Sequence, residues 1–191
     1  MLRSLTAMSF SSFLPPFAAF RYCPRCGSGP SAPGHEPVFS CAGCGFHYHF
    51  NPVVAAGVIA EDAQGRVLLV RRAKDPGRGL LGVPGGFVDF EETAEAAVRR
   101  EAREETGIEV GELRFLGSWP NVYEFREIAY PVLDLYFTGR TRDGSTASAC
   151  HEVAEVLWLR PEEIDPTALA FPTTRAALLG YGEAAHRGRA V

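Results

Sequence analysis

Three glutamates near the middle of the chain have the spacing that metal-dependent chemistry needs. Glu101, Glu104 and Glu105 stand at positions i, i+3 and i+4, so a helix would crowd their carboxylates onto one face. Like charges at this spacing repel, and acids near a helix C-terminus oppose its dipole. The pattern indicates a bound cation, because Mg²⁺ is held by a few carboxylates, waters and substrate phosphates. The alternative is a solvated helix whose charges serve solubility.

A single helix is expected to position these acids. Asp89, followed three residues later by Glu92, predicts a capping-box-like start. Gly107 offers the left-handed residue that ends a helix. Small and apolar residues between them supply helix propensity and a thin apolar stripe: Ala94, Ala96, Ala97, Val98 and Ala102. Just before this helix, the run from Pro84 to Gly86 lets backbone carbonyls approach a metal or phosphate.

The stretch from Gly86 to Ile108 resembles the Nudix box of the Nudix hydrolase family. Gly86 is followed after five residues by Glu92, and after seven more by Arg-Glu-Ala-Arg-Glu-Glu-Thr-Gly-Ile, residues 100–108. Every fixed position of the box is filled, and Ala102 stands where a larger aliphatic residue is usual. This match is the strongest signal in the chain.

The resemblance implies a role for each box residue. Glu101, Glu104 and Glu105 would bind Mg²⁺ or Mn²⁺ together with the backbone carbonyl of Gly86. Arg100 would orient the glutamates through charge-assisted hydrogen bonds. A divalent ion held in this way neutralises charge on a phosphoanhydride and lowers the pKa of a bound water.

Two further roles stay open at this point. Glu92 would be an outer ligand or a residue that supports the helix start. The general base would be a box glutamate or an acid from a later loop, where Glu152 is preferred over Glu155. Arg71 and Arg72 end an apolar run, where they could face the phosphate site or serve solubility; Arg71 is the candidate for binding substrate.

Four cysteines form a second signal. Cys23 and Cys26 make one Cys-x-x-Cys pair, and Cys41 and Cys44 make another, with fourteen residues between the pairs. This spacing predicts a four-cysteine zinc ribbon whose filled tetrahedron makes the zinc structural. Two disulfides in an exported protein are the rival interpretation. Cys150 has no local partner and is expected to be a small, at least partly buried residue.

The ribbon is expected to serve packing or dimerisation. Residues 28–40 contain no lysine or arginine, so they are poorly suited to gripping the phosphates of a nucleic acid. With four thiolates available, His35, His47 and His49 are expected to be ordinary surface or packing residues. The formal net charge of −4 also argues against non-specific attraction to nucleic acid.

Residues 1–20 are expected to be a tail or a targeting segment. They include Pro15 and Pro16 and contain no acid, since the first acid of the chain is Glu36. This composition is typical of an organelle transit segment. A loose tail, or a true start at Met8, is favoured over it. No apolar run is long enough to span a bilayer, so a cytoplasmic protein is expected.

The rest of the chain predicts an α/β domain over residues 51–191, after a ribbon over residues 21–50. Apolar, β-branched runs predict strands, and a helix is expected over residues 172–179 with Pro172 in its first turn. The expected strands cover residues 53–60, 67–70, 113–119, 128–138 and 153–159, with a turn at Asp143–Gly144. Helices among mixed strands suggest an α/β/α sandwich around a mixed sheet, and the Nudix resemblance implies the same fold.

The layout of ribbon, Asn51-Pro52 and box is similar to that of NADH pyrophosphatases. Those enzymes split NADH, and relatives split FAD or ADP-ribose, into two monophosphates. NADH-specific members carry Ser-Gln-Pro-Trp-Pro-Phe-Pro after the box, whereas residues 117–125 here read Gly-Ser-Trp-Pro-Asn-Val-Tyr-Glu-Phe. This departure puts NADH specificity in doubt. Trp119, Tyr123 and Phe125 could stack on a base or belong to the core.

The sequence thus predicts a metal-dependent pyrophosphohydrolase of a small nucleotide. One rival is a nucleotide sensor without turnover, but such modules tend to lose box acids and this box has lost none. Another is a hydrolase that removes a dinucleotide cap from RNA, against which the net charge and the unbasic ribbon weigh. The resemblance also makes a homodimer an expected partner state.

Overall fold

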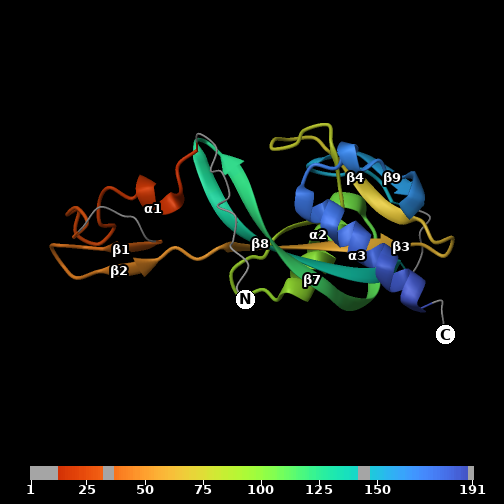
Figure 1. Cartoon of the computed structure of the whole chain (residues 1–191), viewed down its shortest axis with the longest axis horizontal. Coiled ribbons are helices and arrows are strands. Elements are labelled where there is room, and N and C mark those ends of the chain that lie inside the picture. Colours follow the sequence, from red (N-terminus) through yellow and green to blue (C-terminus); the bar gives the residue numbers. More distant parts are fainter. Residues whose placement is uncertain (1–12, 32–36, 142–146, 189–191) are drawn as a thin grey trace, which may run out of the picture. The chain divides into compact units, whose positions relative to one another are not determined.

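A computed structural model of the chain describes residues 13–31, 37–141 and 147–188, with side chains described up to residue 183 (Figure 1). The chain divides into two compact units. The larger unit consists of Val53–Asn121 and Val132–Val191, and the smaller of Met1–Pro52 and Val122–Pro131.

A mixed sheet forms the larger unit. Its central strand β3 (Val53–Glu61) pairs in parallel with β8 (Ile128–Thr141), from Val53 opposite Val132 to Glu61 opposite Arg140. The strand order is β5-β4-β3-β8-β7, with β6 paired to β3 and β9 paired to β4. The remaining strands are β4 (Val67–Arg72), β5 (Leu81–Gly82), β6 (Gly85–Phe87), β7 (Val110–Phe125) and β9 (Val153–Leu159).

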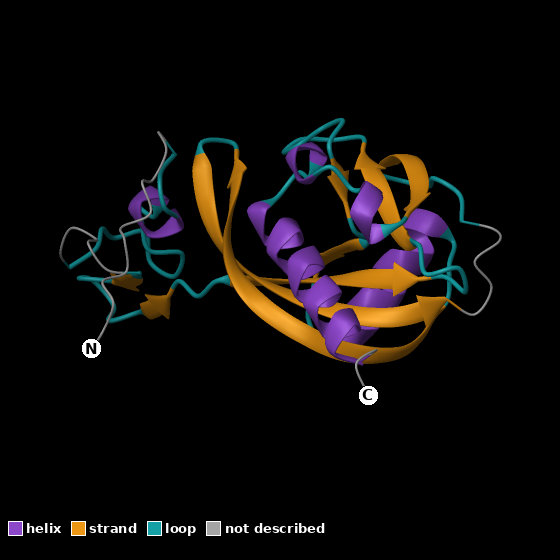
Figure 2. Ribbon diagram, turned by 45° about the vertical axis from the view of Figure 1, so that its right-hand side comes forward, coloured by secondary structure: helices purple, strands orange, loops and turns teal. Residues whose placement is uncertain are grey.

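Two helices cover opposite faces of this sheet. Because side chains alternate along a strand, Val58 of β3 joins a core with Ala97 and Val98 of α2 (Ala94–Thr106). Its neighbour Ile59 joins a second core with Ala177 of α3 (Pro172–Gly188). The short 3₁₀ helices η1 (Pro161–Glu163) and η2 (Pro166–Ala168) lead into α3 (Figure 2). The predicted α/β/α sandwich is confirmed.

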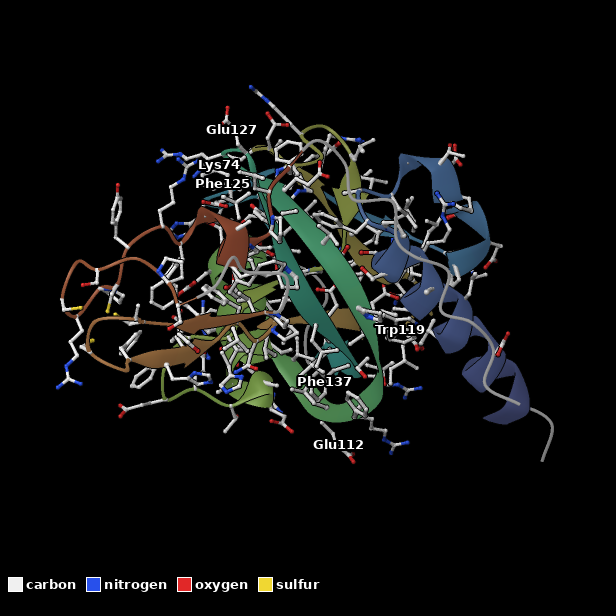
Figure 3. The ribbon with its side chains drawn as sticks, turned by 60° about the vertical axis from the view of Figure 1, so that its left-hand side comes forward. Lys74, Glu112, Trp119, Phe125, Glu127 and Phe137 are labelled. Carbon is white, nitrogen blue, oxygen red and sulfur yellow. The ribbon has the colours of Figure 1, made fainter. Side chains whose placement is uncertain are left out.

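Strands β7 and β8 also contribute to both cores. Phe137 packs in the core that contains α2, and Trp119 packs beside the core that contains α3 (Figure 3). Both strands are longer than the sequence predicts. β7 extends at both ends and runs on into the hairpin whose tip belongs to the smaller unit, while β8 begins at Ile128 as predicted and continues past residue 138 to Thr141. The remaining strand predictions hold, and α3 begins at Pro172 as expected but runs to Gly188, beyond the predicted end at residue 179. The expected turn at Asp143–Gly144 lies outside the described residues.

The smaller unit contains the cysteine pairs and a two-stranded antiparallel sheet. Strand β1 (Val38–Ser40) pairs with β2 (His47–His49), and Phe39 is buried beside Cys23 and Cys41. A four-residue helix α1 (Pro16–Ala19) precedes the ribbon. Phe20, just after α1, packs edge-on against Phe50 with ring centroids 4.8 Å apart.

The segment before α1 is tied to the hairpin tip. Leu14 forms a parallel bridge with Ile128, through hydrogen bonds from Leu14 N to Glu127 O (2.9 Å) and from Ala129 N to Leu14 O (2.8 Å). Residues 13–20, which the sequence assigns to a tail, therefore make specific contacts within this unit. The predicted domain boundaries at residues 20 and 50 stay predictions.

Candidate active site and metal centre

The helix that carries the box glutamates begins later than the sequence predicts. The N-cap of α2 is Thr93, whose hydroxyl accepts a hydrogen bond from Ala96 N (3.2 Å). Asp89 and Glu92, the predicted capping pair, instead close a turn in front of the helix, in which Asp89 N donates to Glu92 Oε2 (3.1 Å). The prediction was wrong because Thr93 also has a capping side chain and stands closer to the helix. Gly107 ends the helix as predicted, with a φ of 71°.

Arg100 is the centre of the charge cluster on α2. Its Nε and Nη2 donate to the two carboxylate oxygens of Glu92 at 3.0 and 2.9 Å. Its Nη1 donates to Glu101 Oε1 (2.7 Å) and Glu104 Oε2 (3.3 Å). These contacts hold the pKa of Glu92 below its ordinary value and raise that of Arg100. Arg100 thus fixes the directions of three glutamates, as the resemblance implies.

Burial sets Glu105 apart from the other box glutamates. Desolvation raises the pKa of Glu105 to about 7, against the opposing hydrogen bond from Gly85 N to its Oε2 (3.1 Å). The nearby charges of Glu101 and Glu152 add to the increase, and the charge of Arg72 opposes it. Burial likewise raises the pKa of Glu101, although Arg100 works against that increase.

Gly86 leaves the room that Glu101 occupies. A Cβ added at Gly86 would overlap the carboxylate of Glu101, so only glycine lets the backbone of β6 come this close to the acid. The residues therefore fit a divalent cation: Glu101 and Glu105, both with raised pKa values, lie beside the Gly85–Gly86 backbone, and Arg100 holds Glu104 next to Glu101. Glu101, Glu104, Glu105 and the carbonyl of Gly86 would hold Mg²⁺ or Mn²⁺.

The loop before β9 brings Glu152 within electrostatic reach of Glu105. Glu152 Oε1 forms an ion pair with Lys74 Nζ and accepts a hydrogen bond from it at 2.6 Å. Glu155, the less favoured candidate for the base, pairs instead with Arg71 Nε at 2.7 Å. The structure thus separates the two candidate bases by their partners.

The predicted substrate-binding residues have different surroundings. Arg71 also donates to Gly79 O (3.0 Å), so its guanidinium has two partners in the protein. Trp119 packs edge-on against Tyr136 with centroids 5.6 Å apart, as a core residue would. Tyr123 and Phe125 belong to the smaller unit, where Arg126 lies over the ring of Phe125 at 5.2 Å.

Asp134, for which the sequence predicts no role, lies at the centre of a buried polar network. Its Oδ2 accepts hydrogen bonds from Thr173 Oγ1 (2.6 Å) and Asn121 Nδ2 (2.8 Å). Tyr136 contacts Thr173 (3.2 Å) and Thr174 (3.0 Å). A charged residue inside the apolar run of residues 128–138 was the signal that could have revealed it.

The four cysteines converge in the smaller unit. Cys23 Sγ lies 3.7 Å from Cys44 Sγ, and Cys26 Sγ lies 3.5 Å from Cys41 Sγ. Sulfurs at the corners of a tetrahedron, each about 2.3 Å from zinc, would be about 3.8 Å apart. None of the five cysteines, all of them described, is in a disulfide. The cluster therefore fits zinc, and Cys150 is partly buried as expected.

In the described part of the chain, these cysteines are the one group of three or more His, Cys, Asp or Glu whose ligand atoms all lie within 4.8 Å of one another. Hydrogen bonds from Ser28 lower the pKa of Cys26 to about 6, whereas the contact with Cys26 and burial raise the pKa of Cys44 to about 12 against a backbone hydrogen bond at Phe46. Of the box glutamates, Glu101 and Glu104 are bridged by Arg100 instead.

Comparison with curated proteins finds relatives that carry one description. The NAD-capped RNA hydrolase NudC of Pseudomonas aeruginosa is 36% identical over 102 residues, which are 52% of this chain and 36% of that protein. NudC of Vibrio vulnificus is 28% identical over 158 residues, which are 83% of this chain and 58% of that protein. The chain thus spans between about a third and just over half of the length of these relatives.

Comparison with solved structures finds the same fold. A NUDIX hydrolase from Nitrosomonas europaea superposes with a TM-score of 0.67 and 26% identity, over 88% of this chain and 93% of that one. The NUDIX domain of Shewanella oneidensis NrtR superposes with a TM-score of 0.59 and 22% identity, over 70% and 88%. The family profile of the NUDIX domain matches residues 51–178. Together with the sandwich and the box sequence, this match shows that the chain belongs to the Nudix family.

Proposed function

We propose that this protein is a metal-dependent pyrophosphohydrolase of nucleoside diphosphate derivatives. The assembly around Arg100 carries the proposal: one guanidinium holds Glu92, Glu101 and Glu104, while Gly86 leaves space for the Glu101 carboxylate. A box that had lost turnover would not need this arrangement. The catalytically silent sensor is therefore the weaker interpretation.

The chain's own residues divide the work of the reaction. Mg²⁺ or Mn²⁺, when bound, would neutralise phosphate charge and lower the pKa of a water. Arg100 keeps Glu101 and Glu104 oriented, and Glu105 is fixed by Gly85 N. Glu152, held by Lys74, is the proposed acceptor of the water's proton. The reaction adds one water across the P–O–P bridge and yields two monophosphates.

We propose NADH, FAD or ADP-ribose as the substrate type. The layout of ribbon and box supports this class, and so does the description of the NudC relatives as NAD-capped RNA hydrolases. That description also makes NAD-capped RNA a second candidate, although residues 28–40 contain no lysine or arginine for RNA phosphates. Both candidates share the bond that is cleaved, and they differ in whether an RNA chain is attached to the dinucleotide.

The test is a product assay with Mg²⁺ or Mn²⁺ on NADH, NAD, FAD, ADP-ribose and oxidised nucleoside triphosphates. Glu104→Gln is expected to abolish release of monophosphates because it removes a proposed ligand and a partner of Arg100. Glu95→Gln, on the exposed first turn of the same helix, is the matched control and should keep full activity. Tight binding of one nucleotide without turnover would establish the sensor instead.

A parallel assay with NAD-capped RNA separates the two substrate candidates. A higher kcat/KM on free dinucleotides than on the capped RNA supports the small-molecule proposal, and the reverse order supports the RNA candidate.

The homodimer remains a prediction that light scattering can check. In the described residues no helix is long and apolar enough to cross a membrane.

A further inference from the structure

Two histidines on the ribbon present adjacent ring nitrogens that neither the box nor the zinc cluster uses. His47 and His49 lie two positions apart on β2, so their side chains share one face of the strand. Their Nε2 atoms are 3.0 Å apart, and their rings meet edge to face with centroids 4.7 Å apart. Both residues are exposed. An ion could therefore reach the nitrogens from solvent.

The neighbouring strand supplies a hydrogen-bond partner for the other ring nitrogen of His47. Ser40 lies opposite His47 in the register of β1 and β2, and its Oγ is 2.8 Å from His47 Nδ1. When Nδ1–H donates to this hydroxyl, the lone pair of Nε2 is left free. Histidines that bind metals commonly donate their other ring N–H to a partner in this way. His47 is thus oriented as a ligand before any ion arrives.

We propose that His47 and His49 form a second metal site, which binds a divalent transition-metal ion through both Nε2 atoms. Imidazole nitrogens suit Zn²⁺, Cu²⁺ and Ni²⁺. Without the ion, one Nε2–H donates to the other Nε2. On binding, His49 moves its proton to Nδ1, a small rotation of the rings turns both lone pairs to the ion, and water completes the coordination.

The ligand type favours one class of ion. Affinity of nitrogen sites rises through the divalent ions from Mn²⁺ to Ni²⁺ and Cu²⁺, so the histidine pair is expected to bind these last two ions, with waters as the remaining ligands. The thiolate cluster, by contrast, is suited to zinc.

The test is calorimetric titration of Ni²⁺ into the zinc-loaded full chain, with Mg²⁺ in excess to occupy the glutamates. One Ni²⁺ should bind per chain, and His47→Ala or His49→Gln should each weaken binding at least about tenfold. Ser40→Ala should weaken it less, since it removes only the support of the tautomer. Tyr48→Phe, on the opposite face of β2, is the matched control and should bind as the wild type does.

Two further measurements make the result decisive. Bound Ni²⁺ should broaden the ring NMR signals of His47 and His49 selectively, and the zinc content should stay at one ion per chain in every variant. Equal Ni²⁺ affinity in a variant that carries both His47→Ala and His49→Gln, or unbroadened His47 and His49 signals in the wild type at saturation, would overturn the proposal. Unchanged zinc content shows that a variant which loses Ni²⁺ still has a folded ribbon.

Discussion

Arg71 and Arg72 are neighbours in sequence, yet their side chains have different electrostatic surroundings. Arg71 is paired with Glu155 and with the carbonyl of Gly79. The guanidinium of Arg72 lies over the ring of Phe171 at 5.1 Å and donates from Nε to Pro76 O at 2.7 Å, and its charge reaches Glu105. We therefore propose Arg72 as a further candidate for binding a substrate phosphate, beside the predicted Arg71.

A pair of variants decides between these arginines. Arg72→Ala is expected to lower kcat/KM by about 10- to 150-fold. This range corresponds to the loss of one hydrogen bond to a charged group, which contributes about 1.5–3 kcal/mol. Arg71→Ala should lose an exposed ion pair with Glu155 and a hydrogen bond to Gly79 O, and it should change kcat/KM less than Arg72→Ala does. Steady-state kinetics on ADP-ribose would show this, with thermal melting to confirm that both variants fold. The opposite ranking would return the role to Arg71.

At the scale of single elements, the start of α2 shows how locally a helix end is decided. The sequence contains two capping side chains four positions apart, Asp89 and Thr93. Thr93 caps the helix, while Glu92 turns towards Arg100, which is eight residues further along the chain. Glu92 thus has two roles, because its carboxylate pairs with Arg100 and also accepts a hydrogen bond from Asp89 N, as in one half of a capping box.

This assignment of the cap can be tested by stability. Thr93→Ala should lower the free energy of unfolding by about 1 kcal/mol, because Ala96 N loses its acceptor. Asp89→Ala should cost only a few tenths of that amount, since its carboxylate is exposed and makes one 3.7 Å contact with Arg100. Urea titrations of the two variants give the comparison, and a larger loss for Asp89→Ala would show that it caps the helix.

The network around Asp134 joins α3 to two strands and predicts a pH effect. Burial raises the pKa of Asp134, although hydrogen bonds from Thr173 and Asn121 oppose the increase. The folded protein therefore holds this proton more tightly than the unfolded chain, whose aspartates titrate near about pH 3.9. The contribution of Asp134 to stability is complete below that pH and is lost as the pH rises through the raised pKa of the folded state.

Two aspartate variants should show opposite trends. The stability of wild type relative to Asp134→Asn is expected to fall as the pH rises from about 3.5 to 7. Asp165→Asn is the control of opposite sign, because hydrogen bonds from Thr167 lower the pKa of Asp165. The contribution of Asp165 to stability is present above the pKa of the unfolded chain and is lost as the pH falls through the lowered pKa of the folded state. Urea titrations followed by tryptophan fluorescence report on the larger unit, which holds Trp119 and Trp158. Equal trends for both variants would contradict the assignment.

Much of the fold could be predicted because its signals are local. Alternating and β-branched runs located the strands, and the box located α2 and its acids. The Asp134 network could not be predicted, since Asn121, Asp134 and Thr173 are brought together only by strand pairing and helix packing. The different partners of Arg71 and Arg72 also depend on tertiary contacts that sequence spacing does not contain.

At the scale of the whole molecule, the two units have different sources of stability. The larger unit has apolar cores on both faces of its sheet. Among the described residues of the smaller unit, the cluster around the cysteines buries Cys23, Phe39 and Cys41. So small a core needs a metal to hold it together.

Zinc removal should therefore affect the units unequally. A strong chelator is expected to collapse the amide NMR signals of residues 23–50 and leave those of β3, β4 and α2 in place. Cys41→Ser should have the same effect without chelator, because it removes one of four ligands. Cys150→Ser is the control, since this residue lies outside the cluster. Loss of signals throughout the chain would show that the larger unit depends on zinc as well.

The bridge between Leu14 and Ile128 has a consequence for the order of events on the ribosome. The four cysteines emerge early, but the strand that receives Leu14 is synthesised more than a hundred residues after it. At about 5–20 residues per second, the interval between residues 52 and 131 lasts about 4 to 16 s. During that time the segment ahead of the ribbon has no template to pair with. A fragment that ends at Pro52 would remain in this nascent state, with the backbone of Leu14 lacking its strand, although Phe20 could still pack against Phe39 and Phe50.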